Sequence, residues 1–108
     1  MQSLSGEDNR FKNWFESLEY MKDEIAKKDF DIALIGCGAY GLPLASHVKR
    51  LGKIGIHMGG CLQLLFGIKG KRWDKDPKIS KFYNDSWIRP MEVNKPKNYL
   101  KVEDGCYW

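Results

Sequence analysis

The chain has 108 residues, of which 43% are hydrophobic and 30% are charged, and its formal net charge is +4. This length supports one small domain at most, and no apolar run approaches the roughly 18 residues that a membrane-spanning helix needs. The three cysteines, Cys37, Cys61 and Cys106, form no Cys-x-x-Cys pair, which argues against a disulfide framework or a zinc knuckle. We therefore predict a globular protein of a reducing, cytoplasmic compartment.

The positive charge is concentrated in one part of the chain. Residues 67–101 contain ten Lys and Arg against four Asp and Glu, a net +6, whereas the other residues contain eight against ten, a net −2. A basic stretch of this kind can face a phosphate, a nucleotide or an acidic membrane surface. An ordinary solvated surface is the equally simple alternative.

An amphipathic helix is predicted at roughly residues 10–28, after a polar N-terminus, residues 1–9, that we expect to be flexible. Apolar residues recur there at spacings of three and four, which places them on one face of a helix. Such a wide aromatic stripe predicts packing against a core. Its members are Phe11, Trp14, Phe15, Leu18, Met21 and Ile25.

A strand–helix–strand unit is predicted from about Asp31 to Met58. Residues 31–35 form a short apolar run that ends at glycine, which is typical of a parallel strand buried on both faces. Residues 42–51 form the helix and residues 53–58 the second strand, a spacing that suits a right-handed parallel crossover. We therefore predict an α/β fold with a Rossmann-like βαβ unit of parallel strands plus flanking helices. The helix face predicted to be buried carries Leu42, Ala45, Val48 and Leu51.

The domain organisation predicted from these elements is that of an incomplete piece. Two parallel strands rarely form a stable sheet without a third, so we expect the missing strands to come from another part of a longer protein or from another subunit. Residues 10–66 would hold the first helix, the βαβ unit and a short buried helix at residues 61–66. Residues 67–108 would form a basic, aromatic, irregular tail that begins with a glycine-punctuated loop and includes a short helix at residues 79–87.

A glycine turn lies at the end of the first predicted strand. Gly36, Gly38 and Gly41 match G-x-G-x-x-G between a strand and a helix, the context in which glycines let a ligand approach the backbone and helix amides attract anions. Ligands of open α/β sheets lie beyond the carboxyl ends of the strands, and the second strand ends in two further glycines. We therefore predict one phosphate-binding floor, whose contacts are Gly36, Gly38, Tyr40, Gly41, Gly59 and Gly60.

Two features distinguish this turn from a nicotinamide or flavin dinucleotide site. No Asp or Glu occurs between Asp31 and Asp74, so the acid that binds ribose at the end of the second strand is missing. Pro43 also requires the helix to begin near residues 40–42, whereas the dinucleotide fingerprint opens its helix at about the second glycine, Gly38. A tight turn without any ligand remains an alternative.

Other candidate residues flank this turn. His57 ends the second strand and could donate to a phosphate or act as a catalytic base, or it could be a hydrogen-bonded structural residue. Lys71 and Arg72 could bind a diphosphate, and Trp73 could stack on a base or sugar. Asp85 and Arg89 are close enough in sequence to pair. The histidines and cysteines lack metal-ligand spacing, so we predict no metal, and without a nucleic-acid motif we do not predict nucleic acid as a ligand.

Three stretches resemble the carboxy-terminal part of a poorly characterised bacterial family found among surface-polysaccharide genes. They are residues 31–45, residues 57–73 and the ending 102–108, Val-Glu-Asp-Gly-Cys-Tyr-Trp. More distantly, the glycine turn, Leu44-Ala45, Lys49-Arg50-Leu51-Gly52, the strand and its final glycines resemble the end of GT-D type glycosyltransferases.

The GT-D resemblance implies an α/β enzyme that transfers a sugar from a nucleotide-sugar, with a divalent metal held by acidic residues. The acidic motif has no counterpart here, so any metal would be held by residues outside this chain, and we expect the fragment alone to be inactive. The end of the second strand also differs from the family's sequence pattern. In the family an acidic residue precedes Ile-Gly-His, whereas this chain reads Ile56-His57-Met58-Gly59-Gly60. The function predicted is glycosyltransferase-like. A noncatalytic interaction module and a dinucleotide-binding oxidoreductase fragment are the alternatives.

Overall fold

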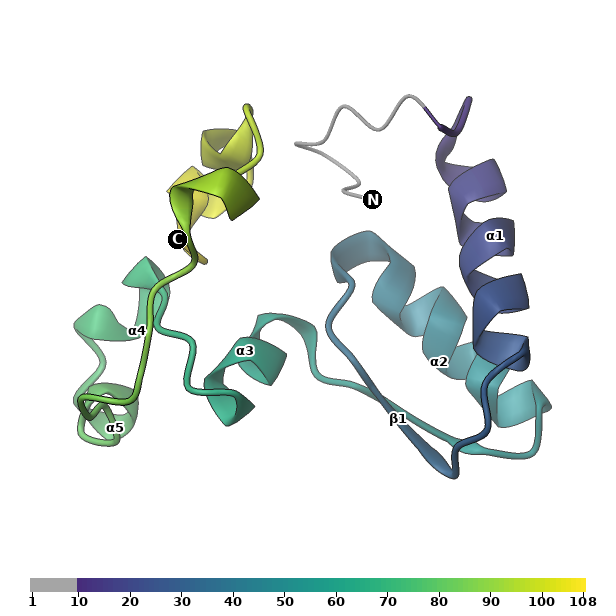
Figure 1. Cartoon of the computed structure of the whole chain (residues 1–108), viewed down its shortest axis with the longest axis horizontal. Helices are drawn as coiled ribbons and strands as arrows, with labels where there is room; N and C mark the ends of the chain where they lie inside the picture. Colours follow the sequence, from purple (N-terminus) through teal and green to yellow (C-terminus); the bar gives the residue numbers. More distant parts are fainter. Residues whose placement is uncertain (1–9) are drawn as a thin grey trace. The chain divides into compact units, whose positions relative to one another are not determined.

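The computed structural model describes residues 10–108, which form two compact units, residues 10–62 and residues 63–108 (Figure 1). The predicted N-terminal stretch, residues 1–9, lies outside the described residues. None of the helices in residues 10–108 is long and apolar enough to cross a membrane. The first unit contains, in order, α1 (Trp14–Ala26), β1 (Ile32–Ile35), the 3-10 turn η1 (Gly38–Tyr40), α2 (Gly41–Arg50), β2 (Ile54–His57) and the 3-10 turn η2 (Gly59–Cys61).

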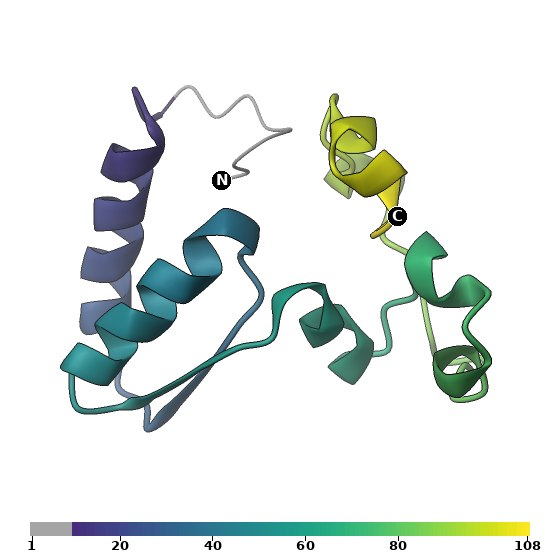
Figure 2. The same ribbon diagram turned by 180° about the vertical axis from the view of Figure 1, so that it is seen from behind.

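The two strands of the first unit pair in parallel. Ile32 lies opposite Ile54, and Ile35 lies opposite His57. Helix α2 provides the crossover between the strands, and α1 packs against α2 (Figures 1 and 2). The predicted α/β fold with a parallel βαβ unit and flanking helices is therefore confirmed.

Helix α1 begins at Trp14 because the preceding residue, Asn13, caps the N-terminus of the helix. The Asn13 side chain accepts a hydrogen bond from the Glu16 amide at 3.0 Å, and the Glu16 carboxylate accepts one from the Lys12 amide at 2.7 Å. The buried residues of this helix are Ser17 and Leu18, whereas Phe15 is 72% exposed. Phe15 therefore does not belong to the buried stripe predicted for this helix, since it lies one position, about 100° of helical rotation, from Trp14.

Helix α2 buries only part of the face predicted: Val48 is buried and Ala45 packs against the core, but Leu42 and Leu51 are exposed and Leu44 is buried instead. Leu44 and Val48, four residues apart, are almost fully buried, whereas Leu42 is 70% exposed and Leu51 is 40% exposed. Leu42 lies two positions before Leu44, about 200° around the helix, so the two side chains point in opposite directions. The shared core of the first unit consists of Leu18, Ile35, Tyr40, Leu44 and Val48.

The sheet is covered by helices on one face. Ile35 is 5% exposed and Ala33 packs against the core, but the side chains that alternate with them point away from it. The prediction that both faces of the strands are buried is therefore wrong within this chain, because α1 and α2 pack on the same side. The outward-facing residues are Ile32, Leu34, Ile54 and Ile56, which are 44–57% exposed.

The second unit is built from short helices. They are α3 (Leu62–Leu65), of which all but the first residue belongs to this unit, α4 (Lys71–Asp74), α5 (Pro77–Ser80) and three 3-10 turns, η3 (Glu92–Asn94), η4 (Tyr99–Lys101) and η5 (Glu103–Gly105).

Three predictions for this region are corrected by the structure. The helix expected to be buried at residues 61–66 has Leu65 and Phe66 at 62% and 70% exposure. The helix expected at residues 79–87 is the single turn α5, which Asp76 caps by accepting from the Lys78 amide at 2.9 Å. The basic loop expected at residues 67–73 already contains the start of α4.

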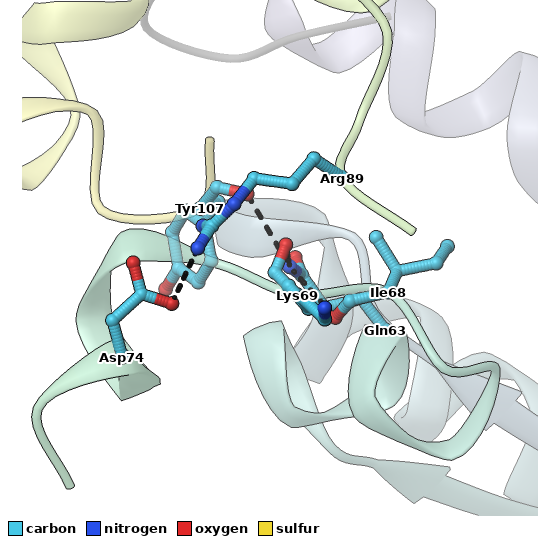
Figure 3. A network of polar contacts seen from close by, with 6 residues as sticks. All are labelled: Gln63, Ile68, Lys69, Asp74, Arg89 and Tyr107. Carbon is cyan, nitrogen blue, oxygen red and sulfur yellow. Dashed lines mark hydrogen bonds and ion pairs between the residues drawn. The ribbon is translucent and has the colours of Figure 1, made fainter. Parts of the chain in front are cut away.

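Side-chain hydrogen bonds connect the C-terminal residues to the rest of the second unit. The Gln63 amide nitrogen donates to the carbonyls of Ile68, Lys69 and Tyr107 at 3.3–3.5 Å (Figure 3). The Arg89 guanidinium pairs with Asp74 at 2.8 Å, not with Asp85 as the sequence suggested. The residues after Val102 therefore belong to the packed structure of this unit.

Candidate functional site

The carboxyl ends of β1 and β2 lie side by side. The Met58 amide donates to the Ile35 carbonyl at 2.9 Å, which extends the strand pairing by one residue beyond His57. A Cβ atom built on Gly36 would lie 2.9 Å from the Gly59 carbonyl oxygen. The two glycine segments therefore lie close together, and a side chain on Gly36 would meet both the Gly59 carbonyl and the Leu62 side chain.

The turn after β1 has the local geometry that its glycines permit. Gly38 has a φ of +49° and Gly59 a φ of +56°, both in the left-handed region that favours glycine. Helix α2 begins at Gly41, so Pro43 lies in its first turn, as predicted from the tolerance for proline at helix starts. A 3-10 turn, Gly38–Tyr40, directly precedes α2. Helical backbone therefore begins at Gly38, earlier than the start near residues 40–42 that was predicted from Pro43.

The predicted contact residues of the turn divide into an outer and an inner set. Gly36 and Gly38 are exposed, whereas Tyr40 and Gly41 are buried. The Tyr40 ring stacks on Trp14, with ring centroids 5.1 Å apart and planes 8° from parallel. Tyr40 therefore anchors the turn to α1, and the exposed backbone of residues 36–39 is the part that a ligand can reach.

His57 is held between the two strands and the start of α2. Its Nδ1 lies 3.3 Å from the Ile35 carbonyl oxygen, which can only accept, so Nδ1 carries the proton of this hydrogen bond. In the neutral ring Nε2 then has the free lone pair. A Cβ atom on Gly41 would overlap the imidazole ring. This contact between Gly41 and His57 was not predicted, because the sequence gives no sign of which helix residue faces the end of β2.

Lys71, Arg72 and Trp73 lie in the second unit. Arg72 forms an ion pair with Glu103 and donates to the Tyr107 hydroxyl at 3.2 Å, and its backbone amide donates to the Cys106 carbonyl at 2.9 Å. Trp73 is 6% exposed, so its indole ring belongs to the core of this unit and presents no open face for stacking. Lys71 is exposed.

No candidate metal centre exists in the part of the chain that the structure describes, residues 10–108. No group of three or more His, Cys, Asp or Glu side chains lies close enough there to hold an ion. The three cysteines are free thiols. The strand ends present the exposed backbone of residues 36–39, the free thiol of Cys37 and the imidazole of His57.

A parallel βαβ unit with glycine segments at both strand ends defines a Rossmann-like α/β protein. The model of one family, the GT-D fold-like domain, matches residues 11–65, about half of the chain, and the chain belongs to this family. The matched segment runs from the residues before α1 to the end of α3, and it contains the glycine turn, His57 and the glycines after β2. The distant GT-D likeness inferred from the sequence is thereby confirmed, and the fold is glycosyltransferase-like. No curated protein and no solved structure matches the chain.

Proposed function

We propose that this chain is a glycosyltransferase-like protein, or part of one, that binds a nucleotide-sugar or a related phosphate ligand at the Gly36–Gly41 turn and acts in surface-polysaccharide synthesis in the bacterial cytoplasm. The observation that carries the proposal is the close approach of the Gly36 and Gly59 segments at the ends of two parallel strands. Ligands of open α/β sheets bind at this end of the strands. Membership of the GT-D fold-like domain family supports a sugar nucleotide over other phosphates.

The residues at the strand ends have specific roles in this proposal. The glycines at positions 36, 38, 59 and 60 allow the phosphates to approach main-chain atoms, as only residues without side chains can. His57 serves as a hydrogen-bond partner or proton acceptor through Nε2, since its Nδ1 is occupied by the Ile35 carbonyl. Lys71 and Arg72 belong to the second unit and receive no role at this site, and any metal would be supplied by residues outside this chain.

Two glycines offer a matched test of ligand binding. Gly59 and Gly52 both have positive φ, +56° and +76°, and a Cβ on either would meet no atom within 4 Å. The substitutions G59A and G52A therefore impose similar backbone strain, but only the first adds a methyl group at the carboxyl ends of the strands. We expect G59A to weaken binding at least about tenfold, a loss of roughly 1.4 kcal/mol, and G52A to leave it unchanged.

The measurement is NMR titration of the full chain with UDP-, GDP- and dTDP-sugars. Binding should shift the amide signals of Gly36, Gly38, Gly59 and Gly60. The proposal is contradicted if none of these nucleotide-sugars binds, if the shifted signals lie elsewhere, or if G52A weakens binding as much as G59A. Tighter binding of reduced nicotinamide dinucleotide than of any sugar nucleotide would favour the oxidoreductase alternative instead.

A second function, that of a noncatalytic interaction module, is favoured by the uncovered face of the sheet. In the parallel register Ile32 lies opposite Ile54 and Leu34 opposite Ile56, so four aliphatic side chains form one uncharged patch. A second copy of the chain presents the same patch, and the absence of charge within it means that two copies can face one another without like-charge repulsion. We therefore propose homodimerisation through this face as the alternative to catalysis.

The dimer is tested by light scattering at increasing protein concentration. We expect the chain to self-associate, and the substitution I54K to abolish association because it places a charge in the centre of the apolar patch. The substitution L42K is the control, because Leu42 is 70% exposed on α2 and lies outside the patch. A monomer at all concentrations, or equal effects of I54K and L42K, would rule out this interface.

A further inference from the structure

The second unit has exposed lysines that its own acidic residues do not neutralise. The ion pairs among its described residues join Arg72 to Glu103, Arg89 to Asp74 and Lys95 to Glu92. The hydrogen bond to Glu92 raises the pKa of Lys95, as expected for a paired ammonium group. The remaining lysines around α4 and α5 are exposed and have no ion-pair partner among residues 10–108; they are Lys71, Lys75, Lys78 and Lys81.

The chain that follows α5 exposes large apolar side chains at high density. Between residues 82 and 93 its regular secondary structure is limited to an isolated β-bridge between Ile88 and Ile68 and the first two residues of η3. Four apolar residues of this segment are more than half exposed, although loops of this kind are ordinarily polar. They are Phe82 at 59%, Ile88 at 60%, Met91 at 62% and Val93 at 81%.

Several of these basic and apolar groups lie in one neighbourhood. The Lys81 ammonium lies 5.0 Å from the centre of the Phe82 ring, and Phe82 is hydrogen-bonded back to the last turn of α5, which carries Lys78. The Lys69 amide donates to the Ile88 carbonyl at 2.7 Å, and its ammonium lies 5.4 Å from the Tyr83 ring centre. We call the exposed residues Lys78, Lys81, Phe82 and Ile88, together with the half-buried Lys69, the basic–apolar surface.

We propose that the basic–apolar surface binds the second unit to anionic lipid membranes. Lysines attract acidic headgroups, and an adjacent exposed ring and aliphatic chain enter the boundary between headgroups and acyl chains; stable peripheral binding needs such a combination of two signals. Single-stranded nucleic acid would use rows of aromatic rings for base stacking. Three of the four exposed apolar residues between residues 82 and 93, Ile88, Met91 and Val93, are not aromatic, which favours the lipid surface.

Vesicle co-sedimentation tests this proposal with the full chain. Vesicles of phosphatidylglycerol and phosphatidylcholine are compared with vesicles of phosphatidylcholine alone. We expect binding to the anionic vesicles only, and loss of binding when salt rises from about 0.1 M to about 1 M, because the Debye length falls from about 10 Å to about 3 Å. Each lysine beside an anionic bilayer strengthens binding roughly fivefold, so K78Q/K81Q should weaken it roughly 25-fold.

Two further variants test whether weaker vesicle binding results from loss of the basic–apolar surface itself, and not from a lower net charge or a loss of stability. K28Q/K49Q removes the same two charges from exposed positions of the first unit and should leave vesicle binding within about twofold of the original, because these lysines lie outside the surface. F82A should weaken binding without lowering stability, because Phe82 is mostly exposed. The proposal is overturned if the anionic vesicles do not bind, if K28Q/K49Q weakens binding as much as K78Q/K81Q, or if a single-stranded oligonucleotide binds through these residues and the vesicles do not. None of these outcomes depends on whether the glycine turn binds a nucleotide-sugar.

Discussion

The substitution L44A is expected to lower the free energy of unfolding of the first unit by about 2–5 kcal/mol, the range for removing a buried leucine side chain. Leu44 is 2% exposed and belongs to the core that joins α1, β1 and α2. Since this core contains few fully buried side chains, little neighbouring material is available to fill the cavity. The loss is therefore a large share of the stability that a unit of this size can have.

The matched control for this prediction is L42A. Leu42 is the same residue type on the same helix but is 70% exposed, so its truncation should change stability by less than about 0.5 kcal/mol. Trp14 lies in the first unit, whereas Trp73, Trp87 and Trp108 lie in the second. Fluorine NMR of protein labelled with 5-fluorotryptophan, recorded during urea unfolding, therefore reports on the two units separately. Equal losses for L42A and L44A at the Trp14 signal would contradict the helix face described above.

The βαβ unit could be predicted from the sequence, but its buried faces could not. Strand, glycine turn, helix and strand follow one another at a spacing that suits a parallel crossover. The face of α2 is ambiguous in the sequence, because Leu42 and Leu44 are both apolar and lie on opposite sides of the helix. Which one is buried depends on where α1 packs, a tertiary fact that helix periodicity does not contain.

At the candidate site, too, the features set by a local sequence motif could be predicted, whereas those set by long-range contacts could not. The glycine turn and the glycines after β2 are read from a local motif, and the parallel register brings them together as predicted. The burial of Tyr40 and Trp73 results from contacts with Trp14 and Tyr107, which are distant in sequence. The short helices of the second unit likewise depend on long-range contacts, such as those of Gln63 and Arg72 with the last residues of the chain.

Glycines in the first unit allow backbones to approach one another at several points. A Cβ on Gly55 of β2 would lie 2.9 Å from the Ala45 carbonyl oxygen of α2, and one on Gly36 would lie 2.9 Å from the Gly59 carbonyl oxygen. Helix α2 can therefore approach β2 closely, and the segments that follow the two strands can approach each other. His57 occupies the place where β2 meets the start of α2, against Gly41. Gly41 should therefore determine the position of the only histidine at the candidate site.

The substitution G41A is expected to lower the free energy of unfolding of the first unit by about 1–3 kcal/mol, the usual cost of overpacking. Its methyl group would overlap the His57 imidazole and displace the ring from its hydrogen bond to the Ile35 carbonyl. Backbone strain does not contribute, because Gly41 has ordinary right-handed helical angles, φ −59° and ψ −49°. With the ring removed by H57A, the same substitution should be neutral or stabilising by up to about 1 kcal/mol, as alanine is at a compatible helical position.

A double-mutant cycle between Gly41 and His57 measures this coupling. Chemical unfolding of the original chain, G41A, H57A and G41A/H57A gives four free energies, and the Trp14 fluorine signal assigns them to the first unit. H57A alone should cost about 1 kcal/mol, the value of one hydrogen bond, so the double variant should be more stable than the two single losses predict. Additive losses would mean that the methyl group clashes with something other than the imidazole, and the orientation of His57 described here would then be incorrect.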